Sequence, residues 1–148
     1  MKKLLCLLII AIVFIIASCT SIEKGPLEGA WECVSSKYIS HEDSSSYSID
    51  NNSTRKYIKL ITKKRFIFID QDTTEESAVF GGGVYTYDGE TYTETFDSFK
   101  NPKFIGHSVT YSIKMINNEL HISGIMEMKE WGVWDYNYKI EEIWRKIE

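Results

Sequence analysis

The chain has 148 residues, of which 43% are hydrophobic and 14% are aromatic, and a formal net charge of −4 at pH 7. This length suits one domain with one core. We do not expect a nucleic-acid partner, because the chain is acidic and lacks the clustered Lys and Arg residues that bind phosphates.

The N-terminus is typical of an export signal. Lys2 and Lys3 precede an apolar run at 4–16, which is long enough for a signal peptide and short for a membrane span. The run ends in Ile16-Ala17-Ser18-Cys19, which resembles a bacterial lipobox. We therefore expect acylated Cys19 to hold the protein on the membrane, with an ordinary signal peptide and an incidental cysteine as the alternative.

Processing at this site divides the chain into a signal peptide (1–18), a lipidated tether (19–28) and a β-barrel domain (29–148). Thr20 follows the cysteine where an aspartate would favour retention in the inner membrane. The expected location is thus the cell envelope, anchored in the outer membrane. Cys33 then has no intrachain disulfide partner, and its position on the strand face of Trp31 predicts a small buried hydrophobe.

Alternation with period two dominates the mature chain and predicts antiparallel strands. The expected strands are 29–36, 56–62, 65–70, 78–87, 90–96, 108–116, 119–126 and 134–146. The polar segment 37–55 is predicted to be a long surface loop with a short strand near 47–49. About eight strands joined by short turns predict an all-β fold, a single antiparallel up-and-down β-barrel, with a two-sheet sandwich as the alternative.

Three tight turns set the expected pairing of these strands. Residues 62–65 form one, and Asp88-Gly89 and Asn117-Asn118 are predicted to be two-residue type I′ loops, which require positive φ. The Asp88-Gly89 loop would place Tyr85 opposite Tyr92 and Gly83 opposite Glu94. The three glycines at 81–83 are interpreted as a bulge or bend that leaves space beside Glu94.

Two strands combine aromatic side chains and a carboxylate on the same face. Tyr85, Tyr92 and Glu94 share a face of the first hairpin, whereas the other face carries threonines. In the last strand the aromatic face includes Glu142. Because an unpartnered buried carboxylate is costly, we expect a partly wet cavity in the barrel. The predicted ligand-binding residues are Tyr85, Tyr92, Glu94, Trp134, Tyr136, Tyr138 and Glu142.

Other acidic and histidine residues do not form a recognisable site. The three histidines lack the spacing of metal ligands, so neither a metal nor another cofactor is expected. Asp70 and Asp72 are spaced like the start of a calcium loop, but the glycine and glutamate that complete an EF-hand are absent. Residues 70–76 are therefore interpreted as a solvated hairpin loop.

The sequence also resembles a known family. Gly29-Ala30-Trp31 resembles the G-x-W signature of the lipocalin and fatty-acid-binding-protein superfamily. More closely, the chain resembles small lipocalin-like bacterial proteins, many of them lipoproteins, of largely uncharacterised function. The segments that carry this resemblance are GAW, KLITKKRFIF, GGGVYTYDGETYTETF, Gly106 before a strand, HISG at 121–124 and the closing IEEIW.

The resemblance implies a lipocalin-like barrel closed by a basic residue stacked on Trp31. The family usually ends in E-x-W-x-R, whereas this chain ends in Glu142-Ile143-Trp144-Arg145-Lys146. Either Lys146 occupies the position of the family's arginine, or a bulge turns Arg145 inward. The expected closure residues are Trp31, Trp144, Arg145 and Lys146.

We expect a monomeric, lipid-anchored binding protein that holds a small amphipathic or hydrophobic ligand in the barrel. The alternative is an interaction or structural lipoprotein, an accessory subunit or an inhibitor, with a filled barrel and no ligand. Catalysis by Glu94 and Glu142 as a general acid and base is a third reading, and we expect no enzymatic activity. A void beside the two carboxylates would favour the first function, whereas an exposed apolar patch would favour the second.

Overall fold

The computed structural model describes residues 25–50, 52, 54–76 and 78–147. The predicted signal peptide and Cys19 lie outside these residues. Nine strands account for most of the described chain, and a single 3₁₀ turn, η1 (Pro102–Phe104), precedes β7. The strands are β1 (Gly29–Ser40), β2 (Ser46–Asp50), β3 (Arg55–Ile61), β4 (Arg65–Asp72), β5 (Val79–Tyr87), β6 (Thr91–Phe99), β7 (Ser108–Ile116), β8 (Glu119–Met126) and β9 (Tyr138–Lys146).

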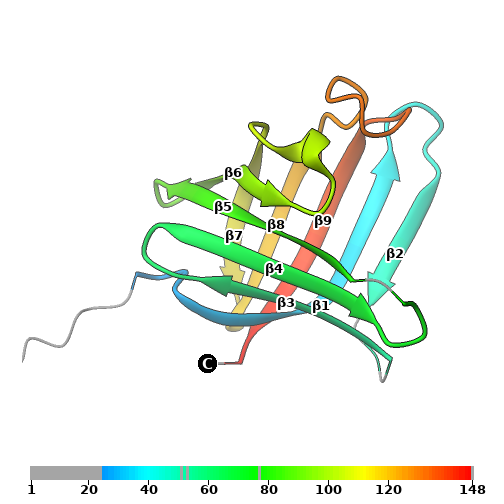
Figure 1. Cartoon of the computed structure of the whole chain (residues 1–148). Helices are drawn as coiled ribbons and strands as arrows, with labels where there is room; N and C mark the ends of the chain where they lie inside the picture. Colours follow the sequence, from blue (N-terminus) through cyan, green and yellow to red (C-terminus); the bar gives the residue numbers. More distant parts are fainter. Residues whose placement is uncertain (1–24, 51, 53, 77, 148) are drawn as a thin grey trace, which may run out of the picture.

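Eight of these strands close into an antiparallel up-and-down barrel. From β3 to β9 each strand pairs with the next along the chain, and β1 pairs with both β3 and β9. The ninth strand, β2, pairs with residues 35–39 of β1, whereas β3 pairs with residues 29–32 on the same side of β1. Figure 1 shows β3, β4 and β5 crossing in front of β7, β8 and β9. The predicted all-β up-and-down barrel is confirmed.

The two ends of the barrel differ in their connections. Short hairpin turns at 62–64, 88–90 and 117–118 join the strands at the end where β1 begins. The longer connections, which include 41–45, 73–76, 100–107 and 127–137, lie at the opposite end, which we call the mouth (Figure 1). The two ends therefore differ in the length of chain that covers them: short turns cover the closed end, and longer loops surround the mouth.

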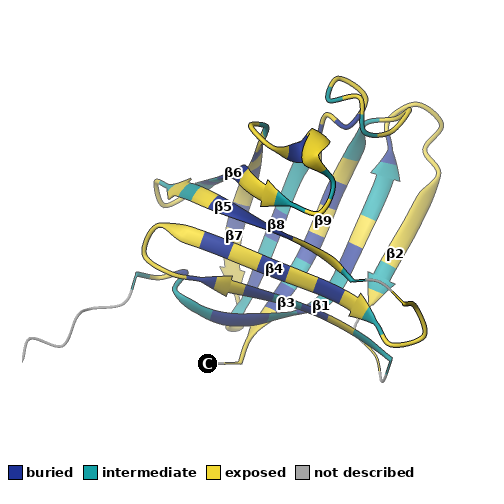
Figure 2. Cartoon of the chain, in the orientation of Figure 1, coloured by how far each residue is buried: buried dark blue, intermediate teal, exposed yellow. Residues whose placement is uncertain are grey.

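Buried residues alternate with less buried ones along most barrel strands (Figure 2), whereas β5 has three consecutive buried glycines at 81–83. The floor toward the closed end is filled by large side chains that are at most 2% exposed, among them Trp31, Trp144, Phe66, Phe96 and Val109. Cys33 is completely buried in the same core, as expected, and burial raises the pKa of its thiol. The lower half of the barrel is therefore a packed core.

Two predicted turns have different outcomes. Asn117 and Asn118 both have positive φ, at 51° and 64°, and Ile116 pairs with Glu119, so the two-residue loop is confirmed. At the other turn Tyr87 pairs with Tyr92, and only Gly89 has positive φ, so the predicted Asp88-Gly89 register is wrong. The Asp88 carboxylate accepts hydrogen bonds from the backbone N–H groups of Glu90 and Thr91, which stabilises a longer loop.

The shift at this hairpin is two residues, and a two-residue shift keeps every side chain on its predicted face. Gly83 consequently lies opposite Phe96 instead of Glu94. A bulge occurs between Gly82 and Gly83, as expected, with Asp97 as the extra residue on β6. The glycine at 83 is required because a Cβ there would overlap the carbonyl oxygen of Thr95.

The segment predicted to be a long loop, 37–55, contains more strand residues than expected. Residues 37–40 belong to β1 instead of a loop, because they pair with β9 and with β2. The short strand expected near 47–49 is present within β2. Asp70 was expected both at the end of strand 65–70 and in the solvated loop 70–76. It lies in β4 and is only 8% exposed, so the loop interpretation is wrong for this residue.

Candidate functional site

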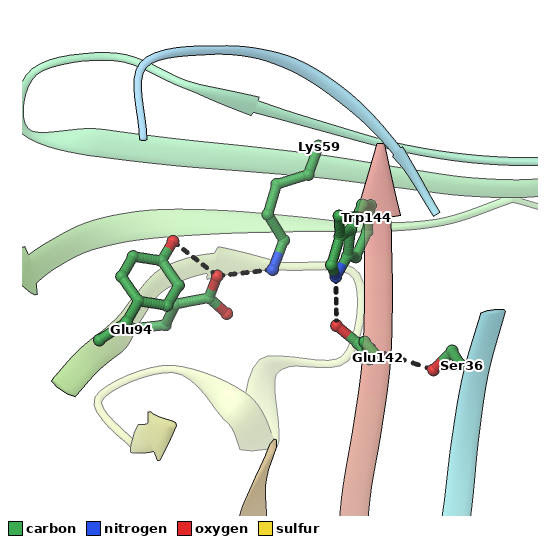
Figure 3. Close-up of polar contacts among 6 residues, drawn as sticks. Ser36, Lys59, Glu94, Glu142 and Trp144 are labelled. Atoms are coloured by element: carbon green, nitrogen blue, oxygen red, sulfur yellow. Dashed lines mark hydrogen bonds and ion pairs between the residues drawn. The ribbon is translucent and has the colours of Figure 1, made fainter. Parts of the chain in front are cut away.

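The two inward carboxylates anchor a buried hydrogen-bond network in the floor of the barrel (Figure 3). The Glu94 carboxylate on β6 accepts hydrogen bonds from the Lys59 ammonium at 2.7 Å and from the Tyr92 hydroxyl at 2.8 Å. On β9, Glu142 accepts hydrogen bonds from the Trp144 indole N–H at 2.8 Å and the Ser36 hydroxyl at 3.1 Å. Both carboxylates thus have partners within the protein.

Lys59 connects the two halves of this network. Its Nζ lies 4.8 Å from the centroid of the Trp144 ring, and Trp144 in turn contacts Glu142 (Figure 3). Burial opposes the charge of Lys59, but Glu94 and Glu142 together raise the pKa of its ammonium above the ordinary value. Burial raises the pKa of Glu142, while Lys59 and Trp144 oppose that rise. The network is therefore an ion pair, Lys59–Glu94, with a second carboxyl group close by.

A cavity of about 1070 Å³ opens above this floor, at the mouth of the barrel. Aromatic side chains from β1, β2, β3, β4, β6, β9 and the two longest mouth loops dominate its lining. Tyr57 separates the cavity from the network, because it lines the cavity and packs edge to face on Trp144 with 4.7 Å between ring centroids. The aromatic lining residues are Tyr38, Tyr47, Tyr57, Phe68, Phe99, Phe104, Trp134, Tyr136 and Tyr138.

One ion pair lies in the cavity wall. Arg55 at the start of β3 donates two hydrogen bonds to Asp70 on β4, with distances of 2.8 Å from Nε and 2.6 Å from an Nη atom. These bonds with Asp70 raise the pKa of the Arg55 guanidinium, although burial opposes this. The pair supplies polar groups in a lining that also includes the apolar Met126, Met128 and Val79.

The connection between β8 and β9 packs on the barrel and also lines the opening of the cavity. Trp131 stacks on His107 with 4.8 Å between ring centroids, and it packs edge to face on Phe104. Trp134 lies in the same loop but is 45% exposed and contacts the edge of Tyr138. Trp131 therefore anchors the loop to the barrel, while Trp134 lines the opening.

The structure separates the predicted ligand-binding residues into two groups. Trp134, Tyr136 and Tyr138 line the mouth cavity. Tyr92, Glu94 and Glu142 lie inside the barrel, as expected, but in the buried network below the cavity. Tyr85 is half-buried near the closed end, where its hydroxyl donates to the backbone carbonyl of Thr62.

The closure residues resolve the alternative left open by the sequence. Lys146 pairs with Trp31 across β1 and β9, and its Nζ lies 5.4 Å from the centroid of the Trp31 ring. Arg145 points outward and bonds Glu119. Lys146 therefore occupies the stacking position, and no bulge turns Arg145 inward.

Sequence reasoning missed most of the cavity wall, including Tyr38, Tyr47, Arg55 and Asp70. A bulge between Cys33 and Ser35 reverses the inward parity of β1, so that Ser36 and Tyr38 point inward instead of their neighbours. One available signal was the turn at 62–65, because extending its pairing places Tyr57 opposite Asp70 and identifies Asp70 as an inward strand residue.

The closed strand order and the single interior define a lipocalin-like β-barrel. A lipocalin-like protein from Bacteroides uniformis is 17% identical over 83% of this chain and 100% of that chain, with a TM-score of 0.49. An uncharacterized protein from Bacteroides eggerthii is 13% identical over 80% of this chain and 98% of that chain, with a TM-score of 0.47. No family model matches the chain, and neither does any curated protein at a significant level.

Two features are absent from the described residues. None of the helical segments in this part of the chain is long and apolar enough to cross a membrane. Within the same residues, no group of three or more His, Cys, Asp or Glu side chains is arranged to hold a metal ion.

Proposed function

We propose that the protein is a lipid-anchored binding protein of the cell envelope that holds a small amphipathic ligand in the mouth cavity. The observation that carries this proposal is the aromatic-lined cavity of about 1070 Å³ above a packed floor, with the Arg55–Asp70 pair in its wall. Small-molecule sites are concave and mostly apolar, with few polar groups that orient the ligand. The cavity volume of about 1070 Å³ lies just above the range of about 300–1,000 Å³ that is usual for such sites.

The buried network supports the cavity in this proposal. Glu94 and Glu142 bond Lys59, Tyr92, Trp144 and Ser36, so they hold the floor in one arrangement. The ligand's apolar part would lie on Tyr57 and the methionines above that floor. Its polar end would lie near the Arg55–Asp70 pair or the rim, where water has access.

A cavity-filling substitution tests the proposal. Val79 lines the cavity on β5 and is 42% exposed, so Val79→Trp should occupy ligand space at little cost to folding. Its neighbour Phe80 is 49% exposed and absent from the cavity lining, so Phe80→Trp is the matched control. Saturable binding of the neutral apolar dye Nile red should be lost in Val79→Trp and retained in Phe80→Trp.

Equal binding of the dye by both variants, or no saturable binding by the unmodified protein, would contradict the cavity as a binding site. Mass spectrometry of the natively purified protein would identify a ligand that copurifies. Such a molecule should be released when Val79 is replaced by Trp.

A second function is favoured by a different observation. Large apolar side chains lie on the outer face of β3, β4 and β5, each 42–54% exposed: Leu60, Ile67, Ile69, Phe80 and Val84. Leu60 pairs with Ile67, and Ile69 pairs with Phe80, so these side chains form one outer apolar face. A patch of this kind is typical of a protein–protein contact and suits the interaction lipoprotein.

Sedimentation analysis separates this second function from the first. If the outer apolar face binds a second copy, the protein should associate reversibly, and Ile67→Ser with Ile69→Ser should abolish association without changing dye binding. A protein that is monomeric at all concentrations would exclude self-association through this face.

A further inference from the structure

The wall of the mouth cavity contains a group of aromatic rings that offers faces to a ligand. Tyr38 and Tyr47 stack with 4.7 Å between ring centroids and 2° between planes. Tyr138 contacts both rings edge to face, at 6.4 and 6.0 Å, and Trp134 contacts Tyr138 at 5.4 Å. Tyr47 and Trp134 remain 40% and 45% exposed. Ring faces of this kind attract cations through their quadrupole.

Both basic side chains that line the cavity, Arg55 and Lys100, already donate hydrogen bonds within the protein. The Nε–H and one Nη–H of Arg55 both donate to Asp70, whose carboxylate balances the guanidinium charge. The Lys100 ammonium donates to the backbone carbonyl of Ala78 at 2.9 Å. An anionic head group would have to compete with a buried carboxylate for Arg55, because the guanidinium charge is already paired with Asp70.

The connections that surround the mouth are strongly acidic. Segments 41–45, 73–78, 100–107 and 127–137 carry seven carboxylates and three lysines, and Asp72 at the end of β4 adds an eighth carboxylate. Among the described residues, these carboxylates form no ion pair with Lys or Arg. The eight are Glu42, Asp43, Asp72, Glu75, Glu76, Glu127, Glu130 and Asp135.

The negative field of the rim reaches the aromatic wall. The pKa of Tyr138 is raised first by burial and then by Asp43, Tyr136, Glu42 and Asp135. Asp135 also lines the cavity itself. Charges that border a concave site of low polarity raise the local concentration of oppositely charged ligands.

We infer that the mouth cavity selects amphiphiles with a cationic head group, such as an alkylammonium, over anionic amphiphiles of the same chain length. The inference rests on the proposed function, because it requires a ligand in this cavity. The cation lies against the rings of Tyr38, Tyr47, Tyr138 and Trp134, inside the field of the rim carboxylates. The alkyl chain lies deeper, on Tyr57 and Met126.

Three probes with the same alkyl chain test this selection. Dodecyltrimethylammonium, dodecanoate and neutral dodecylglycerol are titrated below their micellar concentrations into the mature chain, residues 19–148, with Cys19→Ser to prevent acylation. The change in tryptophan fluorescence reports binding. The cationic probe should bind at least about tenfold more tightly than dodecanoate at low ionic strength, and the difference should narrow in 0.5 M salt because exposed charges are screened.

Two pairs of variants locate the cause of the selection. Asp70→Asn leaves Arg55 unpaired in the wall, so the preference should disappear or reverse, whereas Asp97→Asn removes the partner of Arg65 on the outer surface and should leave it unchanged. Tyr47→Phe keeps the ring and should keep the preference. Tyr47→Leu removes the ring and should reduce it severalfold.

The outcomes separate the two proposals. If no probe binds the unmodified chain, the proposed function fails together with the inference. If all three probes bind equally, or dodecanoate binds most tightly, the binding function stands and the cationic selection is wrong.

Discussion

Lys146 lies over Trp31 at the point where the last strand meets the first, with 5.4 Å between its Nζ and the centroid of the Trp31 ring. Trp31 is 1% exposed, and its indole N–H donates to the backbone carbonyl of Leu27 at 2.8 Å. The indole therefore seals the closed end, while the lysine covers its outer surface. Strand parity selects Lys146 for this position, since Arg145 faces outward.

This arrangement predicts unequal effects at the two positions. Trp31→Ala should reduce the free energy of unfolding by about 3–5 kcal/mol, because it leaves a cavity in the core. Lys146→Ala should cost only about 0.5–1 kcal/mol, the range for an exposed cation–π contact. Urea titration measures both, and a loss below 1 kcal/mol for Trp31→Ala would contradict its role in closing the barrel.

Because Lys59 and Glu94 form a buried ion pair, substitutions at these two positions should have strongly non-additive effects on the free energy of unfolding. Lys59→Met or Glu94→Gln alone should destabilise by about 3–5 kcal/mol, because each leaves a partner without its counter-charge in the core. The double variant should cost much less than the sum. A double-mutant cycle measured by urea titration gives the coupling, and additive losses would show that the pair does not act as a unit.

Glu142 predicts a dependence of stability on pH. Its pKa is raised above 4.5 in the folded protein, so the folded state binds more protons than the unfolded state in the range above that value. The contribution of Glu142 is therefore fully present below about pH 4.5 and declines as the pH rises through its folded-state pKa. Urea titration at several pH values measures the free energy of unfolding. Its decline with rising pH should be smaller in Glu142→Gln and unchanged in the exposed Glu141→Gln. The same pH dependence in both variants would contradict the role of Glu142 in this decline.

Position 83 in β5 has no room for a side chain, because the backbone of β6 lies too close. Gly83→Ala should destabilise by about 1–3 kcal/mol, because the added Cβ meets the backbone of Thr95. The matched control is Val84→Ala, which trims an exposed side chain on the outer face of the same strand. Thermal unfolding compares the two, and an unchanged midpoint for Gly83→Ala would contradict the close approach of β5 and β6.

The proposed membrane anchor depends on one cysteine. In a diderm bacterium grown with labelled palmitate, the protein should carry label and fractionate with the outer membrane. Cys19→Ala should abolish both, whereas Cys33→Ala should retain both, because Cys33 is buried in the barrel. Labelled Cys19→Ala protein in the membrane fraction would exclude this anchor.

The sequence by itself predicted those features that depend on neighbours along the chain. Alternation with period two identified eight strands and placed Glu94 and Glu142 on the inward face, where both are found. The Asn117-Asn118 turn was also predictable, because its positive φ values are a local preference. The register at the Asp88 loop was predicted wrongly by two residues. The inward and outward faces of this hairpin were still predicted correctly, because a two-residue shift keeps each side chain on the same face.

Only the tertiary structure decided which residues meet across the barrel. The bulge after Cys33 turns Tyr38 inward, and pairing of β1 with β2 brings Tyr47 onto it. Lys59 meets Glu94 across a separation of 35 residues, and Arg55 meets Asp70 between strands that the sequence left partly in loops. A period along the chain specifies the face on which a side chain lies. The partner on that face depends on bulges, loop lengths and barrel closure, which bring distant segments together.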